Sequence, residues 1–166
     1  PQGFVRRHPE TLVVLGHKPL YPATGFGYLR TGAKVLSEGV RVVRVTRFTE
    51  KPDEKTARRY LKSRQYLWNT GAFIFRADTM LGLFKELAPA IYRGLAGGRA
   101  TVSASAYAKL PEISLDYAIM EKAKDIHCVA GEYRWQDMGD FAALRAILRR
   151  EGRAFVERGG KIINVT

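Results

Sequence analysis

The stretch Thr11-Leu12-Val13-Val14-Leu15-Gly16 is a short apolar, β-branched run that ends at a glycine. Such a run predicts a strand that is buried on both faces, as in a sheet covered by other elements on either side. The segment that follows, residues 17–28, holds two prolines and two glycines at close spacing. These residues predict an irregular loop with unusual backbone angles. We therefore expect the chain to begin with a buried strand followed by a loop of defined conformation.

Further strands are predicted where β-branched and aromatic residues concentrate. They lie at residues 26–31, 40–48, 71–75 (entered through 66–70) and 161–165. Four helices are predicted, each behind a residue that can cap the apolar periodic segment after it. The capping residues are Asp53, Asp78, Ser114 and Asp140. Strands and helices interleave, which predicts an α/β fold with a mixed β-sheet flanked by helices, and a length of 166 residues favours a single domain.

The composition, with 46% hydrophobic and 27% charged residues, is that of a globular protein. The single cysteine, Cys128, excludes an internal disulfide and favours a reducing compartment, so we expect a cytoplasmic protein. We expect Cys128 to be a small core residue within the segment 126–130. No apolar run approaches the roughly 18 residues of a membrane span, so no membrane association is expected.

The net charge of +12, from 28 basic and 16 acidic residues, raises the question of nucleic-acid binding. The basic residues are spread along the chain in small groups such as Arg6-Arg7, Arg58-Arg59 and Arg149-Arg150. A solvated basic surface is therefore the favoured interpretation, and no nucleic-acid partner is expected. Attraction of anionic small molecules, such as sugar phosphates and nucleotides, remains open.

Several common catalytic and nucleotide-binding motifs do not occur in the sequence. Neither G-x-G-x-x-G nor G-x-x-x-x-G-K-[ST] is present, and Gly25-Phe26-Gly27 is only the first half of the former. The three histidines, at positions 8, 17 and 127, show no metal-ligand spacing, and no G-x-S-x-G elbow occurs. These observations disfavour a serine hydrolase and a histidine-based metal site.

The segment Phe48-Thr49-Glu50-Lys51-Pro52 ends a predicted strand, and strand ends are where ligands bind in α/β folds. Glu50 can accept hydrogen bonds from sugar hydroxyls, and Lys51 offers a compact positive charge to a phosphate. The alternative is a surface ion pair at a strand-to-helix turn, which is common and contributes little to stability. Taken alone, the motif favours this alternative.

Two more polar residues are candidates for a binding site. Asn69, at the mouth of the strand predicted at 71–75, offers a donor and an acceptor to a polyhydroxy ligand, although a turn-forming Asn explains it equally. Asp137 has no structural role once Asp140 is assigned to a helix cap. It can supply half of a magnesium site, because Mg²⁺ is usually held by one or two carboxylates and substrate phosphates. A turn or capping role for Asp137 stays open.

Five motifs stand in a particular order along the chain. They are Tyr21–Tyr28 (Y-P-A-T-G-F-G-Y), Phe48–Pro52 (F-T-E-K-P), Trp68–Phe73 (W-N-T-G-A-F), Ser114–Lys122 (S-L-D-Y-A-I-M-E-K) and Trp135–Gly139 (W-Q-D-M-G). This series resembles the sugar-phosphate nucleotidylyltransferases, and within them the mannose-1-phosphate guanylyltransferases that make GDP-mannose. The resemblance runs from about Thr11 to Leu148. E-K-P and W-x-D-x-G resemble the wider family, and the other motifs resemble the mannose branch.

The resemblance implies a reaction in which a sugar 1-phosphate oxygen attacks the α-phosphorus of a nucleoside triphosphate and releases pyrophosphate. Gly27 would present its backbone to the sugar, Glu50 would bind the sugar hydroxyls, and Asn69 would contact the ring. Lys51 would hold the sugar phosphate and Asp137 would bind Mg²⁺, the expected cofactor, which makes these two the expected catalytic residues. The expected partners are mannose 1-phosphate and GTP.

The family's glycine-rich G-G-x-G-x-R-L-x-P-L-type loop, which cradles the triphosphate, does not occur in these 166 residues. We therefore expect a partial, Rossmann-like nucleotidyltransferase domain over residues 1–166, the sugar-1-phosphate-binding part, without the N-terminal nucleotide-binding half. Such a chain would bind a hexose 1-phosphate but would not transfer a nucleotidyl group. The alternative is a short, non-catalytic binding or regulatory subunit that completes its sheet against another chain. An exposed sheet edge would also favour homo-oligomers.

Overall fold

The computed structural model describes residues 1–35, 40–95, 101–131, 133, 135–137, 141–150, 152, 155–158 and 161–164. The chain forms two compact units, Pro1–Tyr133 and Arg134–Thr166.

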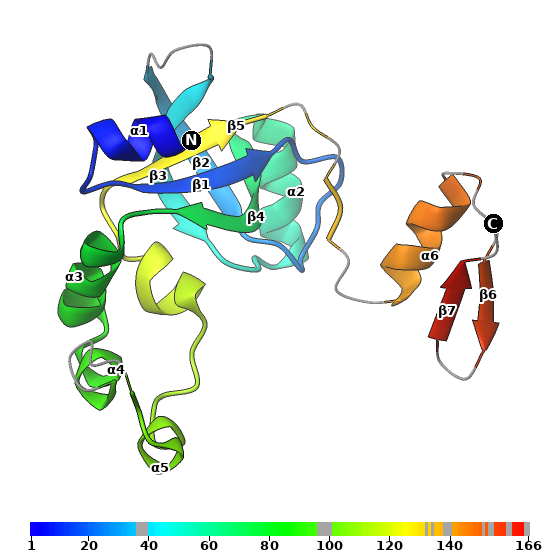
Figure 1. The fold of residues 1–166 in the computed structure, drawn as a ribbon. Helices are drawn as coiled ribbons and strands as arrows, with labels where there is room; N and C mark the ends of the chain where they lie inside the picture. The colour runs from blue at the N-terminus through cyan, green and yellow to red at the C-terminus, as the bar shows by residue number, and fades with distance from the viewer. Residues whose placement is uncertain are drawn as a thin grey trace. The chain divides into compact units, whose positions relative to one another are not determined.

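The first unit is built on five strands that close into a barrel in the order β1-β4-β2-β3-β5 (Figure 1). The strands are β1 (Leu12–His17), β2 (Tyr28–Val35), β3 (Val42–Thr49), β4 (Tyr66–Ile74) and β5 (Ile126–Ala130). β1 and β5 run parallel, whereas the other four pairs of neighbours are antiparallel. The predicted mixed sheet is therefore confirmed, and the first four predicted strands match β1 to β4.

The closure of the sheet differs from the open, Rossmann-like arrangement with an exposed edge that we expected. β5 pairs in parallel with β1, which joins the two ends of the strand order, and its other edge pairs with β3, where residues 42, 43 and 44 lie opposite residues 129, 128 and 127. Each of the five strands consequently has two neighbours. About 80 residues of sequence separate the paired segments of β3 and β5, and the residue pattern within a strand carries no signal for such a distant partner.

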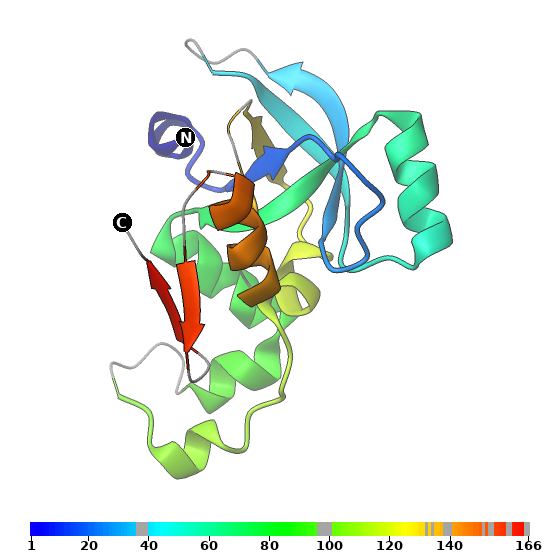
Figure 2. The same cartoon turned by 90° about the vertical axis from the view of Figure 1, so that its right-hand side faces the viewer.

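Six helices accompany the barrel in the described part of the first unit. They are α1 (Gln2–Arg7), α2 (Glu54–Ser63), α3 (Ala77–Leu87), α4 (Pro89–Gly94), α5 (Ala104–Tyr107) and the π-helix η1 (Asp116–Met120). Figures 1 and 2 agree in placing α1 and α2 on opposite sides of the strands. The sequence analysis did not predict α1, α4 or α5, which are too short to show apolar periodicity. It also missed the cap of α5, where Ser103 accepts a 3.2 Å hydrogen bond from the N–H of Ala106.

The predicted helix caps have different outcomes. Asp53 caps α2 as predicted, because its Oδ1 accepts a hydrogen bond of 2.7 Å from the backbone N–H of Thr56. Asp78 does not cap α3, which begins at Ala77; the carboxylate lies in the first turn and pairs with Arg76 at 2.6 Å. Ser114 accepts a 3.4 Å hydrogen bond from the N–H of Tyr117, but the helix that follows is a single π-helical turn and ends earlier than expected.

Strand β1 is buried on both faces, as its apolar run predicts. Leu12 and Val14 belong to one core cluster, which α3 and η1 also enter, while Val13 belongs to a second cluster with Phe4 and Val5 of α1. Alternate side chains of a strand point to opposite faces, so β1 joins the two clusters. Burial of this strand on both sides makes it the centre of the first unit.

The segment 66–74 is one continuous strand, β4, rather than an entry segment followed by a strand. Asn69 therefore lies inside a strand with a buried side chain and not in a turn, although its Oδ1 does bond the backbone N–H two residues on, as the turn interpretation implied. Trp68, directly before it, is also buried.

The second unit contains α6 (Phe141–Arg150), β6 (Phe155–Arg158) and β7 (Lys161–Asn164), with the two strands paired as an antiparallel hairpin. The helix after position 140 and the final strand are as predicted, whereas β6 was not predicted. Asp140, the expected cap of α6, and Val165, the expected end of the last strand, lie outside the described residues. Within the described residues, no helix is long and apolar enough to cross a membrane.

The position of Cys128 generates a chemical prediction. Its side chain is buried in β5 within the main core cluster, and burial raises the pKa of the thiol to about 12. The reactive thiolate fraction at pH 8 is then on the order of 10⁻⁴. We expect a thiol-specific disulfide reagent not to react with the native chain at pH 8. The chain unfolded in guanidinium should react at once and release one equivalent of the reagent's thiol per chain. Rapid labelling of the native protein would contradict this burial.

Candidate functional site

The loop before β2 is held against the barrel by aromatic contacts. Tyr21 and Phe26 meet the ring of Trp68 edge-on, with ring centroids 4.9 and 5.1 Å apart. The buried Tyr28 hydroxyl donates a 2.9 Å hydrogen bond to the carbonyl of Ala23. These contacts hold the shape of the loop and place Gly27 at the start of β2.

The register of three neighbouring strands places Gly27 between two of the candidate site residues. Tyr28 of β2 pairs with Thr49 of β3 on one side and with Trp68 of β4 on the other. Because both pairings are antiparallel, the residue before Tyr28 lies opposite Glu50 and Asn69. The backbone N–H of Asn69 donates a 2.8 Å hydrogen bond to the carbonyl of Gly27, which continues the ladder.

Gly27 leaves room for both neighbours because it has no side chain. A Cβ atom at this position would stand 2.5 Å from Oε2 of Glu50 and 3.2 Å from Cβ of Asn69. The first distance is far below van der Waals contact, so a side chain here would displace the carboxylate. Gly27, Glu50 and Asn69 thus form one row across the sheet.

Glu50 carries a buried carboxylate whose two oxygens differ. The side chain is only 6% exposed, and its Oε1 accepts a 2.7 Å hydrogen bond from Nζ of Lys51. Its Oε2 is buried and has no hydrogen-bond partner among the described residues, as is also true of the hydroxyl of Thr49 beside it. A buried carboxylate oxygen without a donor is costly, so this atom is suited to accept a hydrogen bond from a ligand.

Lys51 is more exposed than its partner and has a strained backbone. Its side chain is 56% exposed, which leaves the ammonium accessible beside the carboxylate. Its φ of +44° is in the left-handed region, although Lys51 is not glycine and stands before Pro52. The hydrogen bond with Glu50 raises the pKa of the Lys51 amine above its usual value, and the charge of Asp116 adds to the shift. Lys51 is therefore a positive charge at neutral pH.

The side-chain amide of Asn69 is hydrogen-bonded at both its oxygen and its nitrogen. Its Oδ1 accepts a 2.9 Å hydrogen bond from the N–H of Gly71, and its Nδ2 donates a 3.1 Å hydrogen bond to Oδ1 of Asp116. Gly71 has a φ of +74°, a conformation that glycine adopts easily. Because an amide nitrogen has two hydrogens, one donor of Nδ2 remains for a ligand.

Two residues of this cluster were not among the candidates from the sequence. Asp116 contacts Asn69, and Oε1 of Glu121 accepts a 2.8 Å hydrogen bond from the backbone N–H of Glu50. Both lie in the motif Ser114–Lys122, for which the sequence indicated no role of any single residue. The only signal in the sequence is two carboxylates spaced by five, and in the α-helix expected there residues at that spacing do not share a face.

The burial of polar groups points to the same cluster. Among the described residues, the buried polar or charged ones are Thr11, Glu50 and Asn69. The hydroxyl of Thr11 lies 2.8 Å from Nδ1 of His127, so it has a structural partner. The other two stand side by side across Gly27. A buried acceptor, an amide donor and an exposed ammonium together suit a ligand with hydroxyl groups at one end and negative charge at the other.

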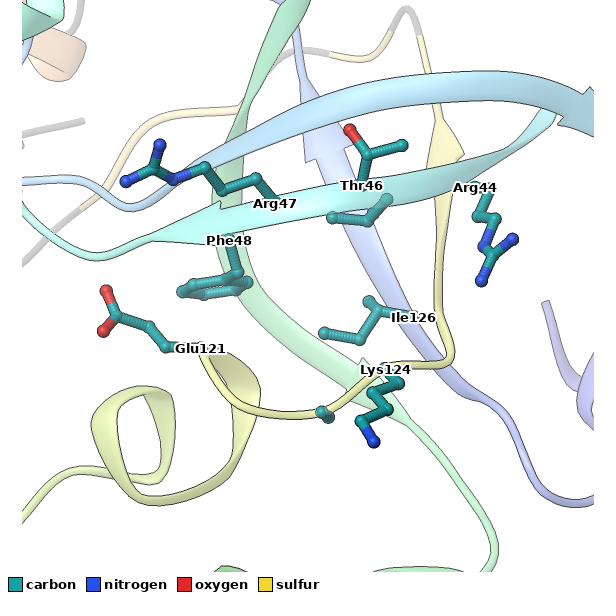
Figure 3. A pocket seen from close by; sticks show the side chains of 9 residues that line it. Arg44, Thr46, Arg47, Phe48, Glu121, Lys124 and Ile126 are labelled. Carbon is teal, nitrogen blue, oxygen red and sulfur yellow. The ribbon is translucent and has the colours of Figure 1, made fainter.

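A surface pocket of about 440 Å³ adjoins this cluster at Glu121 (Figure 3). Its lining residues come from β3 and from the segment between η1 and β5. They are Arg44, Val45, Thr46, Arg47, Phe48, Glu121, Ala123, Lys124 and Ile126. Figure 3 shows the Glu121 carboxylate beside the ring of Phe48. Gly27, Glu50, Lys51 and Asn69 do not line this pocket, so the candidate site is distinct from it.

Asp137 belongs to the second unit, where its side chain is exposed. Its placement relative to Gly27, Glu50, Lys51 and Asn69 is not defined, so the structure brings together four of the five residues predicted from the sequence. Gly139 of the same motif lies outside the described residues. In the part of the chain that the structure describes, no group of three or more His, Cys, Asp or Glu side chains could hold a metal ion.

Residues 3–152 match the protein family described as nucleotidyl transferase. Xanthan biosynthesis protein XanB of Xanthomonas campestris pv. campestris (strain B100) is 36% identical over 160 residues, which cover 91% of this chain and 33% of that protein. Mannose-1-phosphate guanylyltransferase of Escherichia coli is 34% identical over 160 residues, which cover 89% of this chain and 33% of that protein. The chain spans about a third of the length of the curated relatives it matches.

Two solved structures are also similar. A crystal structure described as mannose-1-phosphate geranyltransferase from Thermus thermophilus has 27% identity and a TM-score of 0.77, over 98% of this chain and 58% of that chain. One described as mannose-6-phosphate isomerase from Helicobacter pylori has 26% identity and a TM-score of 0.66, over 78% of this chain and 53% of that chain.

The close approach of Gly27 to Glu50 predicts the effect of adding one methyl group. We expect Gly27→Ala to lower the free energy of unfolding by about 1–3 kcal/mol, the usual range for an overpacked site. Gly25→Ala is the matched control in the same loop, because a Cβ there would meet nothing within 4 Å. Urea unfolding measures both variants. Equal stability of the two would show that Gly27 is not in contact with the carboxylate.

Proposed function

The chain belongs to the nucleotidyl transferase family, whose mixed sheet and helices it shares, and from this membership we propose that it binds the sugar phosphate in a mannose-1-phosphate guanylyltransferase. In the proposed reaction, GMP is transferred from GTP to mannose 1-phosphate, giving GDP-mannose and pyrophosphate. The observation that carries the proposal is the buried Oε2 of Glu50, which lacks a partner among the described residues and faces Gly27. Its free lone pairs suit a sugar hydroxyl.

The sugar would be bound at the row formed by Glu50, Gly27 and Asn69. Oε2 of Glu50 would accept a hydrogen bond from one hydroxyl, and the second N–H of the Asn69 amide would donate to another oxygen of the sugar. Gly27 would allow the ring to approach the backbone, since no side chain stands between Glu50 and Asn69. Hydrogen bonds to a charged acceptor are stronger than neutral ones, so Glu50 would contribute more to affinity than Asn69.

The phosphate would be bound at Lys51, whose ammonium is exposed next to the buried carboxylate. An oxygen of the sugar phosphate would form a bond to the α-phosphorus of GTP, while the bond from that phosphorus to the leaving pyrophosphate breaks. Lys51 would orient the attacking phosphate and partly neutralise its charge, which is the main requirement of such a transfer. The nucleophile is already an anion, so no general base is needed.

We propose Mg²⁺ as the cofactor and Asp137 as one of its ligands. An exposed carboxylate on the second unit fits this ion, which often takes only one or two protein carboxylates and completes its shell with water and substrate phosphates. When bound, the ion would neutralise negative charge on the triphosphate.

The activity of the whole protein is part of this proposal, because the chain spans about a third of its curated relatives. The glycine-rich loop that cradles the triphosphate in the family does not occur in the 166 residues. We therefore propose that this chain by itself binds the sugar phosphate and does not transfer GMP. We also propose a cytoplasmic location. Robust formation of GDP-mannose by the purified chain would contradict the first of these statements.

Binding of mannose 1-phosphate to the chain, measured by isothermal titration calorimetry, tests the site. We expect Glu50→Gln to weaken binding about tenfold or more, because the charged acceptor is lost. Lys51→Ala should have a similar effect through the phosphate. Glu54→Gln is the control, since this exposed carboxylate pairs only with Arg58 among the described residues. Glucose 1-phosphate, titrated in parallel, tests the choice of sugar.

Absence of binding to the unmodified chain would overturn the proposal, as would equal dissociation constants for the unmodified chain and Glu50→Gln. Equal affinity for glucose 1-phosphate and mannose 1-phosphate would remove the mannose assignment and leave the sugar-phosphate assignment intact.

The affinity should also depend on pH in a particular direction. The second ionisation of a phosphate monoester has a pKa of about 6, so the ligand gains negative charge between pH 5 and 7. The pKa of Lys51 is raised, so its ammonium stays protonated throughout and beyond this range. We expect affinity to rise from pH 5 to 7 and to stay level up to pH 9, and the rise to be smaller in Lys51→Ala. A fall in affinity between pH 7 and 9 would mean that Lys51 loses its proton there.

A further inference from the structure

We propose that the π-helix η1 positions the sugar-binding residues, with Asp116 orienting the amide of Asn69 and Glu121 holding the backbone of Glu50. This inference rests on the proposed function, because it assigns roles within the same site. Asp116 and Glu121 would not touch the sugar phosphate; they would act through the two residues that do.

Asp116 determines which way the Asn69 amide points. Its Oδ1 accepts from Nδ2 of Asn69 at 3.1 Å, while the N–H of Gly71 donates to Oδ1 of Asn69 at 2.9 Å. An acceptor on one side and a donor on the other leave only one of the two amide orientations fully hydrogen-bonded. The remaining N–H of Asn69 is thereby aimed in one direction before any ligand binds.

Glu121 holds Glu50 at the point where β3 ends. The backbone N–H of Glu50 has no ladder partner there, and Oε1 of Glu121 accepts from it at 2.8 Å. Figure 3 shows the Glu121 side chain reaching from the end of η1 toward β3, beside Phe48. This charged acceptor restrains the backbone at Glu50 and at the next residue, the strained Lys51.

The π-helical turn is what allows one short element to reach both residues. The backbone N–H of Glu121 donates to the carbonyl of Asp116 at 2.9 Å, so the π-type hydrogen bond spans five residues and closes on these two acids. This bond brings Glu121, five positions after Asp116, back over it, which places both carboxylates on the same side of the turn. An α-helical turn would separate them around the axis.

The other side of η1 is anchored in the core. Ala118, Ile119 and Met120 are buried in the main cluster together with residues of β1, β3 and β5. The barrel therefore supports η1, and η1 in turn supports Glu50 and Asn69. Rigid support of this kind lowers the conformational cost of binding a ligand.

Four substitutions in the full chain test the two contacts, with mannose 1-phosphate affinity as the readout. Asp116→Ala and Glu121→Ala each remove a charged acceptor, and we expect each to weaken binding about tenfold. Asp116→Asn and Glu121→Gln keep an oxygen that can accept the same hydrogen bond, so they should recover most of the lost affinity. Glu112→Ala is the control, because it removes an exposed carboxylate shortly before η1 that has no described contact with the site.

Double-mutant cycles separate positioning from general support of the fold. If Asp116 acts through Asn69, then Asp116→Ala should cause no further loss of affinity in an Asn69→Ala background. Likewise, Glu121→Ala should cause a smaller loss in a Glu50→Gln background than in the unmodified chain, because part of its effect acts through the Glu50 carboxylate. A merely structural role would give the same fold-change in both backgrounds. Because Glu121 is exposed, its cycle remains available even if Asp116→Ala fails to fold.

The outcomes of these experiments distinguish this inference from the proposed function. Binding by the unmodified chain together with unchanged affinity in Asp116→Ala and Glu121→Ala would overturn the positioning role alone. Additive losses in both cycles would also overturn it. Absence of any binding by the unmodified chain would overturn the proposed function, and the positioning role with it.

Discussion

Tyr28 pairs with Thr49 on one side and with Trp68 on the other, and the candidate site depends on this double register. A shift of either pairing by one residue would turn the side chains of that strand to the opposite face and separate Gly27 from Glu50 or Asn69. Tyr28 also resists such a shift, because its buried hydroxyl bonds to Ala23 in the preceding loop. Gly27, Glu50 and Asn69 are therefore neighbours mainly because main-chain hydrogen bonds align their three strands.

Local patterns predicted those elements that depend on local physics. The double burial of β1 follows from its unbroken apolar run, and Asp53 caps α2 because a carboxylate before a helix accepts from a free N–H wherever the helix lies. Asp78 shows the limit of this reasoning, because α3 begins one residue earlier and the carboxylate pairs with Arg76. The closure of the barrel depends on β3 meeting β5 across a long stretch of sequence, and no local pattern encodes that encounter.

In the candidate site, too, some features follow from local sequence and others depend on distant contacts. Glu50, Lys51 and Asn69 each had an ordinary local explanation, and only the order of several motifs along the chain suggested that they act together. Asn69 illustrates why: an Asn before a threonine and a glycine has the composition of a turn, but here pairing with neighbouring strands extends β4 through it. Asp116 and Glu121 could not be found in this way, because their shared orientation arises from a π-helical turn that depends on core packing.

The left-handed backbone of Lys51 is a local strain that its ion pair with Glu50 offsets. Glycine adopts this conformation without the steric cost that a side chain imposes, on the order of 1 kcal/mol. Glycine would also remove the only ammonium that pairs with Glu50 among the described residues. The buried carboxylate of Glu50 would then have no described donor on either oxygen, and this loss costs more than the steric strain that glycine relieves. Libraries screened only for thermal tolerance would therefore be expected to keep the lysine, in spite of its strained backbone.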